Sequence, residues 1–375
     1  MYFFTLFCPT ILQALSKRSA RLDLRRSHWA LVRVGVALSS SQICSRTRRS
    51  SVIASLNLQG YLDASLYNFF VSRGLGTGFK LNVAGYWAGI QVFKLLTPWP
   101  AMLIEAGERI LLATDFHLGI EYELAKMGIS IPYQTNRFLR EFMDLVLEHN
   151  PDRVVILGDL KHGVPLTSFQ EKREIPRFFN ALLSEVDRVS LVRGNHDANI
   201  QNLAPEEVEI HPSRGALFGD EYQVAVLHGH AWPYPPLLAA DLIVMGHNHP
   251  AVQLNTPLGV RFTRRAWVRG NLDPVSLAVA LMGFEKIKVK ENPLASFEAA
   301  FGTIIRPPQL VIMPTFNDLM GGIPVNAETP KGLLGPLFRS GAVNVDDFDV
   351  YLLDGAFLGK ISFLRTLLTD PFYMK

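Results

Sequence analysis

The sequence predicts an α/β fold built in layers, and two features of the chain support this prediction. Short apolar runs typical of buried strands alternate with amphipathic helix patterns between about residues 103 and 192. From Tyr222 the pattern becomes rich in strands. Alternating strands and helices are typical of a layered α/β domain, and we expect the later strands to form a second half-sheet packed on the first.

The first half of the fold is expected to contain two helices. Strands are predicted at Leu103–Glu105 and Arg109–Thr114, around a turn at Gly107. A helix pattern follows Pro132, with an apolar face formed by Phe138, Leu139, Phe142, Leu145 and Val146. It ends near Asn150-Pro151, and the next strand starts at Arg153. A second helix carries Ile175, Phe178, Phe179, Leu182 and Leu183 on one face.

Five of the predicted strands end in residues that can bind metal ions. These segments are Asp115-Phe116-His117, Gly158-Asp159, Gly194-Asn195-His196-Asp197, His228-Gly229-His230 and Gly246-His247-Asn248-His249. Open α/β sheets assemble their sites at the carboxyl ends of strands, so we expect the five segments to meet. Side chains two residues apart at a strand end are expected to point the same way, because side chains alternate along a strand. The economical interpretation is one metal centre with two ions.

The types of residue in these segments restrict the metal and its chemistry. Carboxylate, amide and imidazole ligands without a thiolate suit Mn²⁺, Fe or Zn²⁺, and so many imidazoles disfavour Ca²⁺. The two carboxylate oxygens of Asp159 can bridge two ions. Two ions about 3.5–4 Å apart activate a nucleophile and stabilise both oxygens of an in-line displacement at phosphorus. His196 is placed to protonate the leaving oxygen.

Each segment taken alone also has a purely structural interpretation. Gly, Asn and Asp are common turn residues, and a histidine after a strand occurs by chance. The combination is more specific, because six of the ten histidines lie in these segments and all five segments follow strands in series. A metal site is therefore the better interpretation of the set.

The order and spacing of these segments resemble the calcineurin-like metallophosphoesterase superfamily. The resemblance implies a four-layer αββα sandwich and a metal-dependent hydrolase of phosphoric esters. It implies that one metal is held by Asp115, His117, Asp159 and His249. It implies that the second is held by Asp159, Asn195, His228 and His247, and that His196 is the catalytic acid.

A narrower resemblance is to the archaeal phosphoesterases related to the SbcD nuclease. It rests on Asp115–Glu121, Gly158–His162, Phe316–Gly322 and Leu352–Gly355. Three further residues, His162, Asp197 and His230, are candidates either to support a ligand or to contact the substrate. For each of them, a polar loop residue without a role in the site is the alternative.

The chain divides by composition into a basic leader and a mildly acidic remainder. Residues 1–92 hold 11 Lys and Arg against two acids, a net charge of +9, so the other residues carry 26 basic and 32 acidic side chains, a net of −6. We expect residues 1–92 to be a poorly ordered leader or sequence upstream of the native start. Its Arg46–Arg49 run reads as an exposed charged stretch, with a nucleic-acid patch as the alternative.

The remaining boundaries follow from the strand pattern and the motifs. We expect a catalytic domain at 93–275 and an extension at 276–375 that packs on it, with strands at Lys286–Lys290, Leu310–Met313 and Val350–Leu353. Both cysteines, Cys8 and Cys44, lie in the leader, so the rest has no disulfide framework and a cytoplasmic location is expected. No apolar run is long enough to predict a membrane-spanning helix.

The leading functional hypothesis is a two-metal phosphodiesterase with Mn²⁺ as the expected metal and DNA or RNA as candidate substrates. The mildly acidic catalytic part lacks the basic stripe expected of a tight duplex binder. A hydrolase of nucleotides or small phosphodiesters is therefore the alternative. A non-catalytic scaffold of the same fold, like the retromer subunit that lacks the histidine of the third motif, is a different class of protein. The presence of His196 argues against it.

Overall fold

The computed structural model describes residues 86–87, 90–255, 260–327 and 332–369, which belong to one compact unit spanning Asn82–Lys375. Cys8, Cys44, Arg46–Arg49 and most of the predicted leader lie outside the described residues. The first described elements are two short antiparallel strands, β1 (Tyr86–Trp87) and β2 (Ile90–Gln91). Within the described part of the chain, every helix is too short or too polar to span a bilayer.

The first sheet has six strands in the order β3-β4-β5-β6-β7-β8. Their bounds are β3 (Phe93–Leu96), β4 (Ala101–Glu105), β5 (Arg109–Ala113), β6 (Arg153–Ile156), β7 (Arg188–Val192) and β8 (Glu209–His211). Strands β5 to β8 are parallel to one another, whereas β3 and β4 are antiparallel to their neighbours. The carboxyl ends of β5, β6 and β7 therefore lie at one edge of this sheet.

The second sheet has nine strands, with the order β15-β12-β13-β14-β11-β10-β9 and with β16 and β17 joined through β13. Their bounds are β9 (Ala216–Phe218), β10 (Val224–Leu227), β11 (Leu242–Met245), β12 (Pro250–Asn255), β13 (Arg261–Asn271), β14 (Gln309–Ile312), β15 (Ile323–Pro324), β16 (Asp349–Leu352) and β17 (Phe357–Lys360). Strands β10, β11 and β14 are parallel neighbours, so their carboxyl ends also share an edge. The predicted second half-sheet is confirmed.

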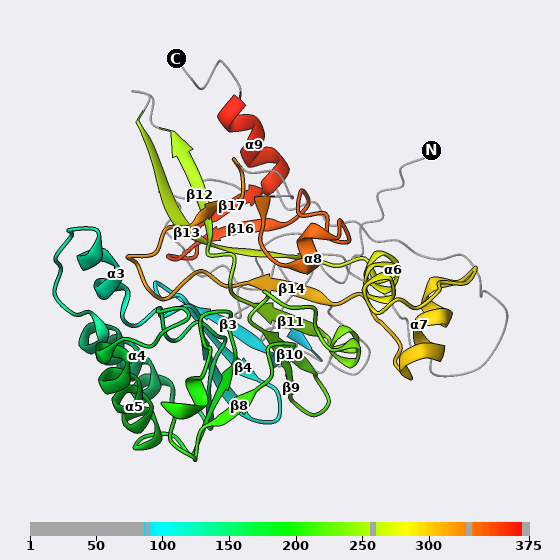
Figure 1. Cartoon of the computed structure of the whole chain (residues 1–375). Helices are drawn as coiled ribbons and strands as arrows, with labels where there is room; N and C mark the ends of the chain where they lie inside the picture. Colours follow the sequence, from blue (N-terminus) through cyan, green and yellow to red (C-terminus); the bar gives the residue numbers. More distant parts are fainter. Residues whose placement is uncertain (1–85, 88–89, 256–259, 328–331, 370–375) are drawn as a thin grey trace, which may run out of the picture. The chain divides into compact units, whose positions relative to one another are not determined.

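Helices cover the outer faces of both sheets, as Figure 1 shows. The helices are α3 (Ile120–Lys126), α4 (Thr135–His149), α5 (Phe169–Leu183), α6 (Pro274–Phe284), α7 (Pro293–Phe301), α8 (Pro336–Arg339) and α9 (Ile361–Thr369), with 3₁₀ turns at Ile200–Asn202 and Pro235–Ala239. The apolar faces of α4 and α5 pack on the first sheet, and α6 to α9 contribute to the core outside the second sheet.

The two sheets pack face to face through a third apolar cluster. This inner core contains alternate residues of facing strands, including Leu112 and Val155 from the first sheet and Val226, Val244 and Val311 from the second. All five side chains are 1% exposed or less. Helices, sheet, sheet and helices thus form four layers, and the predicted α/β sandwich is confirmed.

Several predicted elements near the C-terminus differ from the structure. The alternating Lys286–Lys290 segment was predicted as a strand, but it is irregular chain after α6, and Lys286 has a φ of 59°. Helix α6 is apolar on most of its surface, so it shows no amphipathic period from which to predict it. The boundary expected after residue 275 falls inside α6, and β14 lies within the second sheet between β13 and β11. The proposed division into residues 1–92, 93–275 and 276–375 stays a prediction.

Candidate metal centre

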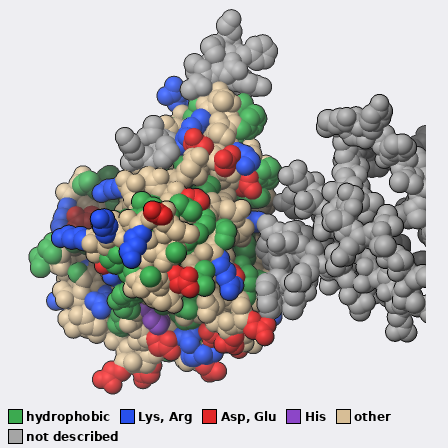
Figure 2. All heavy atoms as spheres, turned by 90° about the vertical axis from the view of Figure 1, so that its right-hand side faces the viewer, with side chains coloured by type: hydrophobic (Ala, Val, Ile, Leu, Met, Phe, Trp, Pro, Cys, Tyr) green, Lys and Arg blue, Asp and Glu red, His purple; other side chains and the backbone are tan. Residues whose placement is uncertain are grey.

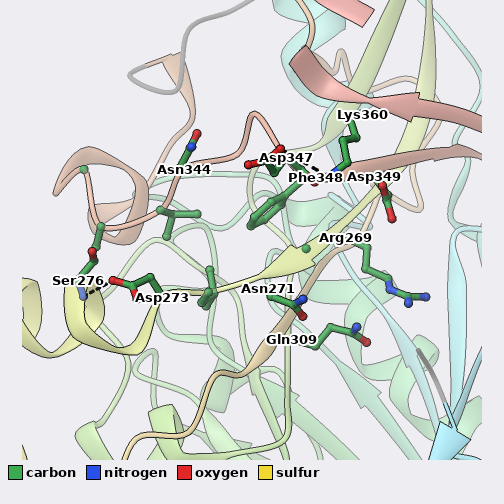
Figure 3. Close-up of a pocket in the computed structure, with 15 residues that line it drawn as sticks. Arg269, Asn271, Asp273, Ser276, Gln309, Asn344, Asp347, Phe348, Asp349 and Lys360 are labelled. Carbon is green, nitrogen blue, oxygen red and sulfur yellow. Dashed lines mark hydrogen bonds and ion pairs between the residues drawn. The ribbon is translucent and has the colours of Figure 1, made fainter. Parts of the chain in front are cut away.

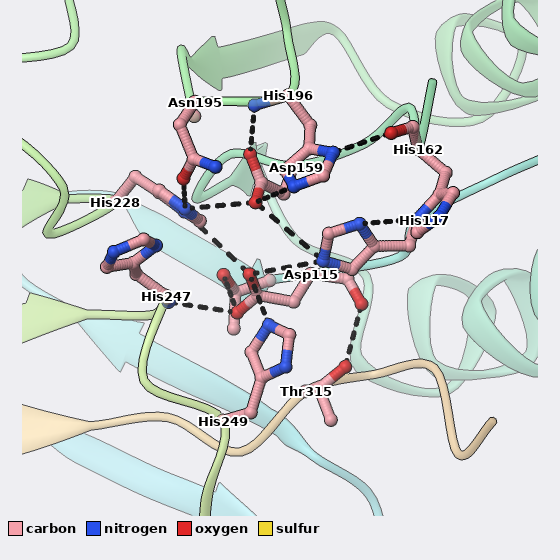
Figure 4. Close-up of polar contacts among 12 residues, drawn as sticks. Asp115, His117, Asp159, His162, Asn195, His196, His228, His247, His249 and Thr315 are labelled. Carbon is pink, nitrogen blue, oxygen red and sulfur yellow. Dashed lines mark hydrogen bonds and ion pairs between the residues drawn. The ribbon is translucent and has the colours of Figure 1, made fainter. Parts of the chain in front are cut away.

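The polar segments that follow five strands converge at one edge of the sandwich (Figure 4). Strands β5, β6 and β7 lead into Asp115, Asp159 and Asn195, and strands β10 and β11 lead into His228 and His247. Three groups of residues each have their possible ligand atoms within 4.8 Å of one another: Asp115, His117 and His249; Asp159, His228 and His247; and His117, His162 and His196. Parallel strands of both sheets therefore deliver their carboxyl-terminal residues to one place.

Five of the candidate ligands have a backbone conformation that strand periodicity does not predict. Asp115, His117, Asp159, His247 and His249 all have positive φ values, between 42° and 67°. They make up five of the eight non-glycine residues with positive φ in the described chain. Strand alternation is therefore the wrong reason for the common direction of Asp115 and His117, because neither residue is extended. Left-handed backbone of this kind is costly, and it clusters at functional sites.

Asp115 lies at the centre of the first group and is fully buried. Its Oδ2 accepts a hydrogen bond from the backbone N–H of His247 at 3.1 Å and lies 2.8 Å from the Thr114 hydroxyl. Its Oδ1 lies 3.0 Å from Nε2 of His249 and 4.0 Å from Nε2 of His117. One carboxylate oxygen is thus held by the chain, while the other faces the imidazoles.

Asp159 lies between the groups. Its Oδ1 accepts a hydrogen bond from the backbone N–H of His196 at 2.8 Å. Its Oδ2 lies 3.3 Å from Nε2 of His228 and 3.7 Å from Nε2 of His117, residues of two different groups. Asn195 Oδ1 lies 3.2 Å from Nε2 of His228. The oxygen of Asp159 that faces the site is therefore shared between the two sets of imidazoles.

These residues meet the requirements of metal ligands by an independent test. Nε2 of His117 is buried and has no hydrogen-bond partner, and it lies 4.0 Å from Oδ1 of Asp115, whose nearest imidazole nitrogen is Nε2 of His249 at 3.0 Å. Buried polar atoms are nearly always satisfied, so a buried carboxylate oxygen surrounded by imidazole nitrogens is suited to share a cation with them. The donor set is mixed nitrogen and oxygen, which suits first-row divalent metals. The residues therefore fit a metal centre.

The pKa values of the carboxylates and histidines follow from burial and mutual attraction. Burial opposes ionisation of Asp115 and Asp159, but attraction to His249 and His228 outweighs it and holds both carboxyl pKa values below their usual range. Burial alone would lower the pKa of His228, yet Asp159 and Asp115 raise it to about 9. Burial lowers the pKa of His117 to about 3. In the metal-free protein, a proton on His228 thus supplies the positive charge that the carboxylates require.

Asp197, a candidate support residue, holds the backbone beneath the site. Its side chain is 1% exposed, and it accepts hydrogen bonds from the N–H groups of Asp159 at 2.7 Å, Leu160 at 3.0 Å and Gly194 at 2.8 Å. Burial, together with repulsion from Asp159, raises its pKa to about 6. Gly194 packs so closely that a Cβ there would overlap Asp159, so only glycine fits this position.

His196 lies at the open side of the site with its side chain 27% exposed. Its Nδ1 lies 2.5 Å from the carbonyl oxygen of His162, so the ring donates Nδ1–H to that carbonyl. Its Nε2 faces inward, 4.0 Å from Oδ2 of Asp159. The His162 ring lies 3.3 Å from the ring of His117, Nδ1 to Nδ1. His230, the third support candidate, has a ring centroid 5.3 Å from that of His228.

A sixth strand end reaches the site, and neither Thr315 nor Asn317 is among the predicted site residues. After β14, the hydroxyl of Thr315 donates to the backbone carbonyl of Asp115 at 2.8 Å, and Nδ2 of Asn317 donates to the carbonyl of Phe116 at 2.8 Å. Both side chains are fully buried. The signal was present, because the apolar run Leu310–Met313 also ends in polar residues, but the run carries no histidine.

Comparison with known proteins identifies the part of the chain that carries the five strand-end segments. Residues 108–256 match the family model of the calcineurin-like phosphoesterases. This range contains all five strand-end segments. Residues 108–256 are therefore a calcineurin-like phosphoesterase segment. The chain thus carries a hydrolase domain for phosphoric esters, in a family that binds two divalent metals. A comparison with curated proteins found no match.

Several solved structures resemble this phosphoesterase at low sequence identity. The nuclease MPE of Pseudomonas putida is 19% identical, with 69% of this chain and 91% of that chain covered and a TM-score of 0.37. The phosphoesterase Yfce of E. coli is 21% identical, with coverages of 39% and 73% and a TM-score of 0.27. These similarities are too low to transfer a substrate.

Proposed function

We propose that this calcineurin-like phosphoesterase is a phosphodiesterase that uses two divalent metal ions. The observation that carries the proposal is the position of Asp159 Oδ2, within 3.7 Å of imidazole nitrogens from both ligand groups. A carboxylate oxygen shared in this way is suited to bridge two cations. We assign Asp115, His117, Asp159 and His249 to one ion and Asp159, Asn195, His228 and His247 to the other.

When bound, the two ions supply Lewis acidity that polarises a phosphoryl oxygen and promotes attack by water. Residues of the chain supply the proton for the leaving group and position the ligand loops. Donation from His196 Nδ1–H to the carbonyl of His162 fixes the ring. In the doubly protonated form of this ring, the proton on Nε2 would be delivered to the leaving oxygen, which leaves a neutral imidazole. His162 contributes its carbonyl, and Asp197 accepts hydrogen bonds from four backbone N–H groups of the ligand loops. Both act by positioning other residues.

We propose Mn²⁺ as the metal, because the ligands combine carboxylates with imidazoles and contain no thiolate. We propose nucleic acid as the substrate class, on the resemblance of the strand-end segments to the SbcD-related phosphoesterases of archaea. On the face drawn in Figure 2, basic and acidic side chains are interspersed with apolar ones. Residues 93–375 carry a net charge of −6, which disfavours tight binding of a long duplex. A cytoplasmic location accords with the cysteine-free catalytic part.

The experiment that tests this function is a Mn²⁺-supplemented assay on four kinds of substrate. They are bis-p-nitrophenyl phosphate, its monoester, a panel of mononucleotides, and single- and double-stranded DNA. We expect the diester to be hydrolysed faster than the monoester, and single-stranded DNA to be cut. Faster hydrolysis of the monoester would contradict the diesterase assignment. Absence of hydrolysis with Mn²⁺, Fe²⁺ and Zn²⁺ would contradict an enzymatic role and favour the scaffold alternative.

A further inference from the structure

A pocket of about 630 Å³ opens directly beside the second ligand group. It is lined by His230, Ala231, Trp232, His247, Phe284, Gly335, Pro336, Arg339 and Ser340. His247 belongs both to this pocket and to the group of Asp159 and His228. A substrate with its phosphate at the metal centre would therefore place an adjoining group in this pocket. The volume is in the range of small-ligand sites.

One wall of the pocket is an aromatic platform. The rings of Trp232 and Phe284 are stacked, with centroids 5.6 Å apart and planes 30° apart. Trp232 is 9% exposed, whereas Phe284 is 51% exposed, so the tryptophan supports a phenylalanine that is open to solvent. A large exposed aromatic ring held against a buried one is a rigid surface on which a planar group can stack.

The platform is fixed by polar contacts between the two segments that carry it. Nε of Arg214 donates to the backbone carbonyl of Trp232 at 3.2 Å, and its guanidinium also pairs with Glu285 at 2.6 Å. Glu285 follows Phe284 directly at the end of α6. Arg214 thus joins the Trp232 loop to the end of that helix.

Two other residues that line the pocket carry polar groups without partners in the described part of the chain. Nδ1 of His230 is buried and has no hydrogen-bond partner. Arg339 is exposed, and its guanidinium makes no ion pair or hydrogen bond with the part of the chain that the structure describes. An unsatisfied ring nitrogen suits the polar edge of a ligand, and an unpaired guanidinium suits a phosphate.

The segment that carries Arg339 is packed against the metal-binding loops. Asn248, between His247 and His249, accepts a hydrogen bond from the N–H of Leu334 at 2.7 Å. Gly335 has a φ of 88° and lies so close to Gly229 that a Cβ would overlap its carbonyl oxygen. The distance between the metal centre and this segment is therefore set by the fold.

We infer that this pocket binds one nucleotide unit of the substrate, with its base on the Phe284–Trp232 platform and a neighbouring phosphate at Arg339. The inference rests on the proposed phosphodiesterase function and names its substrate class. A sugar phosphate has no planar group for the platform, and an acyl chain has no use for the unpaired polar groups. The base must be unpaired to stack here, so single strands and frayed ends are the substrates that fit.

The other large cavity shows no such combination. It has a volume of about 680 Å³ and lies at the opposite end of the second sheet, around Arg269, Asn271, Gln309 and Asp349 (Figure 3). Its lining contains no histidine, and Lys360 there pairs with Asp347 at 3.5 Å. None of the proposed metal ligands is among the residues that line it.

The test compares two inhibitors that differ only in the base. Thymidine 5′-monophosphate and 2-deoxyribose 5-phosphate are titrated against hydrolysis of bis-p-nitrophenyl phosphate by the Mn²⁺-loaded protein. We expect the nucleotide to bind about tenfold or more tighter in the wild type, since stacking on an aromatic ring contributes that much. In Phe284→Ala and Phe284→Leu, the two inhibitors should bind within about threefold of each other.

Phe357→Ala is the matched control. Phe357 is also 51% exposed and also packs on another aromatic ring, that of Tyr351, at 5.1 Å. This variant should keep the wild-type preference for the nucleotide. A preference near one in the wild type, or one retained in both Phe284 variants, would overturn the inference while leaving the phosphodiesterase function intact.

The proposed contact between Arg339 and a second phosphate is tested by comparing a bisphosphate with a monophosphate. Thymidine 3′,5′-bisphosphate should inhibit the wild type at least about threefold more strongly than the monophosphate, because Arg339 pairs with the second phosphate. Arg339→Ala should remove this gain, whereas Arg306→Ala, at another exposed arginine, should keep it. An unchanged gain in Arg339→Ala would exclude Arg339 from the subsite. If the protein hydrolyses no diester, the proposed function fails, and calorimetric titration of the same ligands decides the nucleotide subsite separately.

Discussion

The ring of His196 is fixed by the hydrogen bond from its Nδ1 to the carbonyl of His162, and its Nε2 faces the proposed metal ligands. We expect His196→Asn to retain both metal ions and to lower kcat by about 10²- to 10⁴-fold, because the proton donor is lost without a change of ligand. Metal analysis and steady-state kinetics on a small diester measure both quantities. His149→Asn, at the end of α4, is the control. Activity within about threefold of wild type would rule out the assigned role.

Asp159 and Asp115 differ in what each oxygen contacts, so their substitutions should differ as well. Asp159→Asn is expected to lower the content of both metals, because its Oδ2 faces both imidazole groups. Asp115→Asn should affect mainly one, because its Oδ2 is already held by His247 N–H and Thr114. Metal content per chain after dialysis is the measurement. Loss of a single ion in both variants would argue against a bridging role for Asp159.

At the scale of residues, the sequence identified the chemical types at the site better than their geometry. Asp115 and His117 could be singled out because a carboxylate and an imidazole follow an apolar run. Their left-handed backbone could not be predicted, because it is imposed by packing between two sheets. Trp232, Phe284 and Arg339 carry no local signal at all, since three separate segments bring them together.

The second half of the loop between β6 and α5 is held by the carboxylate of Glu171. Glu171 belongs to a capping box with Ser168 at the start of α5. Its side chain also accepts hydrogen bonds from the N–H groups of His162 at 3.1 Å and Gly163 at 2.6 Å. His196 donates to the carbonyl of His162, and Glu171 fixes the backbone of His162. Glu171 therefore positions the proposed acid indirectly.

Glu171→Gln should therefore lower kcat by about 3- to 30-fold with little change in KM, and should destabilise the fold by about 1–2 kcal/mol. The amide cannot accept at both ends, so at least one backbone N–H loses its partner. Glu174→Gln is the control, because that buried carboxylate lies on the same helix and bonds Arg173 instead. A lower melting temperature with unchanged kcat would show that Glu171 only stabilises the loop.

At the scale of elements, the sequence predicted the strands and helices whose apolar period is regular. The runs behind β5, β6, β7, β10, β11 and β14 are short, apolar and followed by polar residues, so their ends were well marked. Helix α3 is one short segment without a buried stripe, and α6 lacks a polar face. The Lys286–Lys290 prediction failed because alternation over five residues also occurs in an exposed connection.

The stability of the whole metal-free protein should depend on pH in a definite direction. The folded-state pKa of His228, about 9, lies above its ordinary value of 6.5. Its stabilising contribution is therefore complete below about pH 6.5 and is lost as the pH rises through 9. His117 and His247, with pKa values of about 3, resist protonation in the fold and so destabilise it as the pH falls below 6.5.

Denaturant unfolding of chelator-treated protein should thus show greatest stability near pH 6.5 and a decline toward pH 9. Added Mn²⁺ should raise the melting temperature most at the alkaline end, because binding there displaces fewer protons. A metal-free protein that becomes more stable between pH 6.5 and 9 would contradict this account.

The leader prediction can now be tested with a matched pair of truncations. A chain beginning at residue 82, where the compact unit starts, should melt within about 2 °C of full length and keep its diesterase activity. A chain beginning at Phe93 should melt lower. It lacks Val92, which is 2% exposed and whose carbonyl accepts a hydrogen bond from the N–H of Glu105 at 2.7 Å. If the chain that begins at residue 82 melts more than about 5 °C below full length, residues 1–81 stabilise the fold.

Strand β14 has a consequence for the order in which the molecule can be made. It fills the place between β11 and β13, yet it is translated after both of them. A nascent chain that ends before Gln309 leaves the facing edges of these two strands without backbone partners, and such edges are prone to aggregation. It also lacks the Thr315 contact to the backbone of Asp115. A chain that terminates between His249 and Gln309 should therefore yield insoluble product, even though all the proposed metal ligands have already been synthesised.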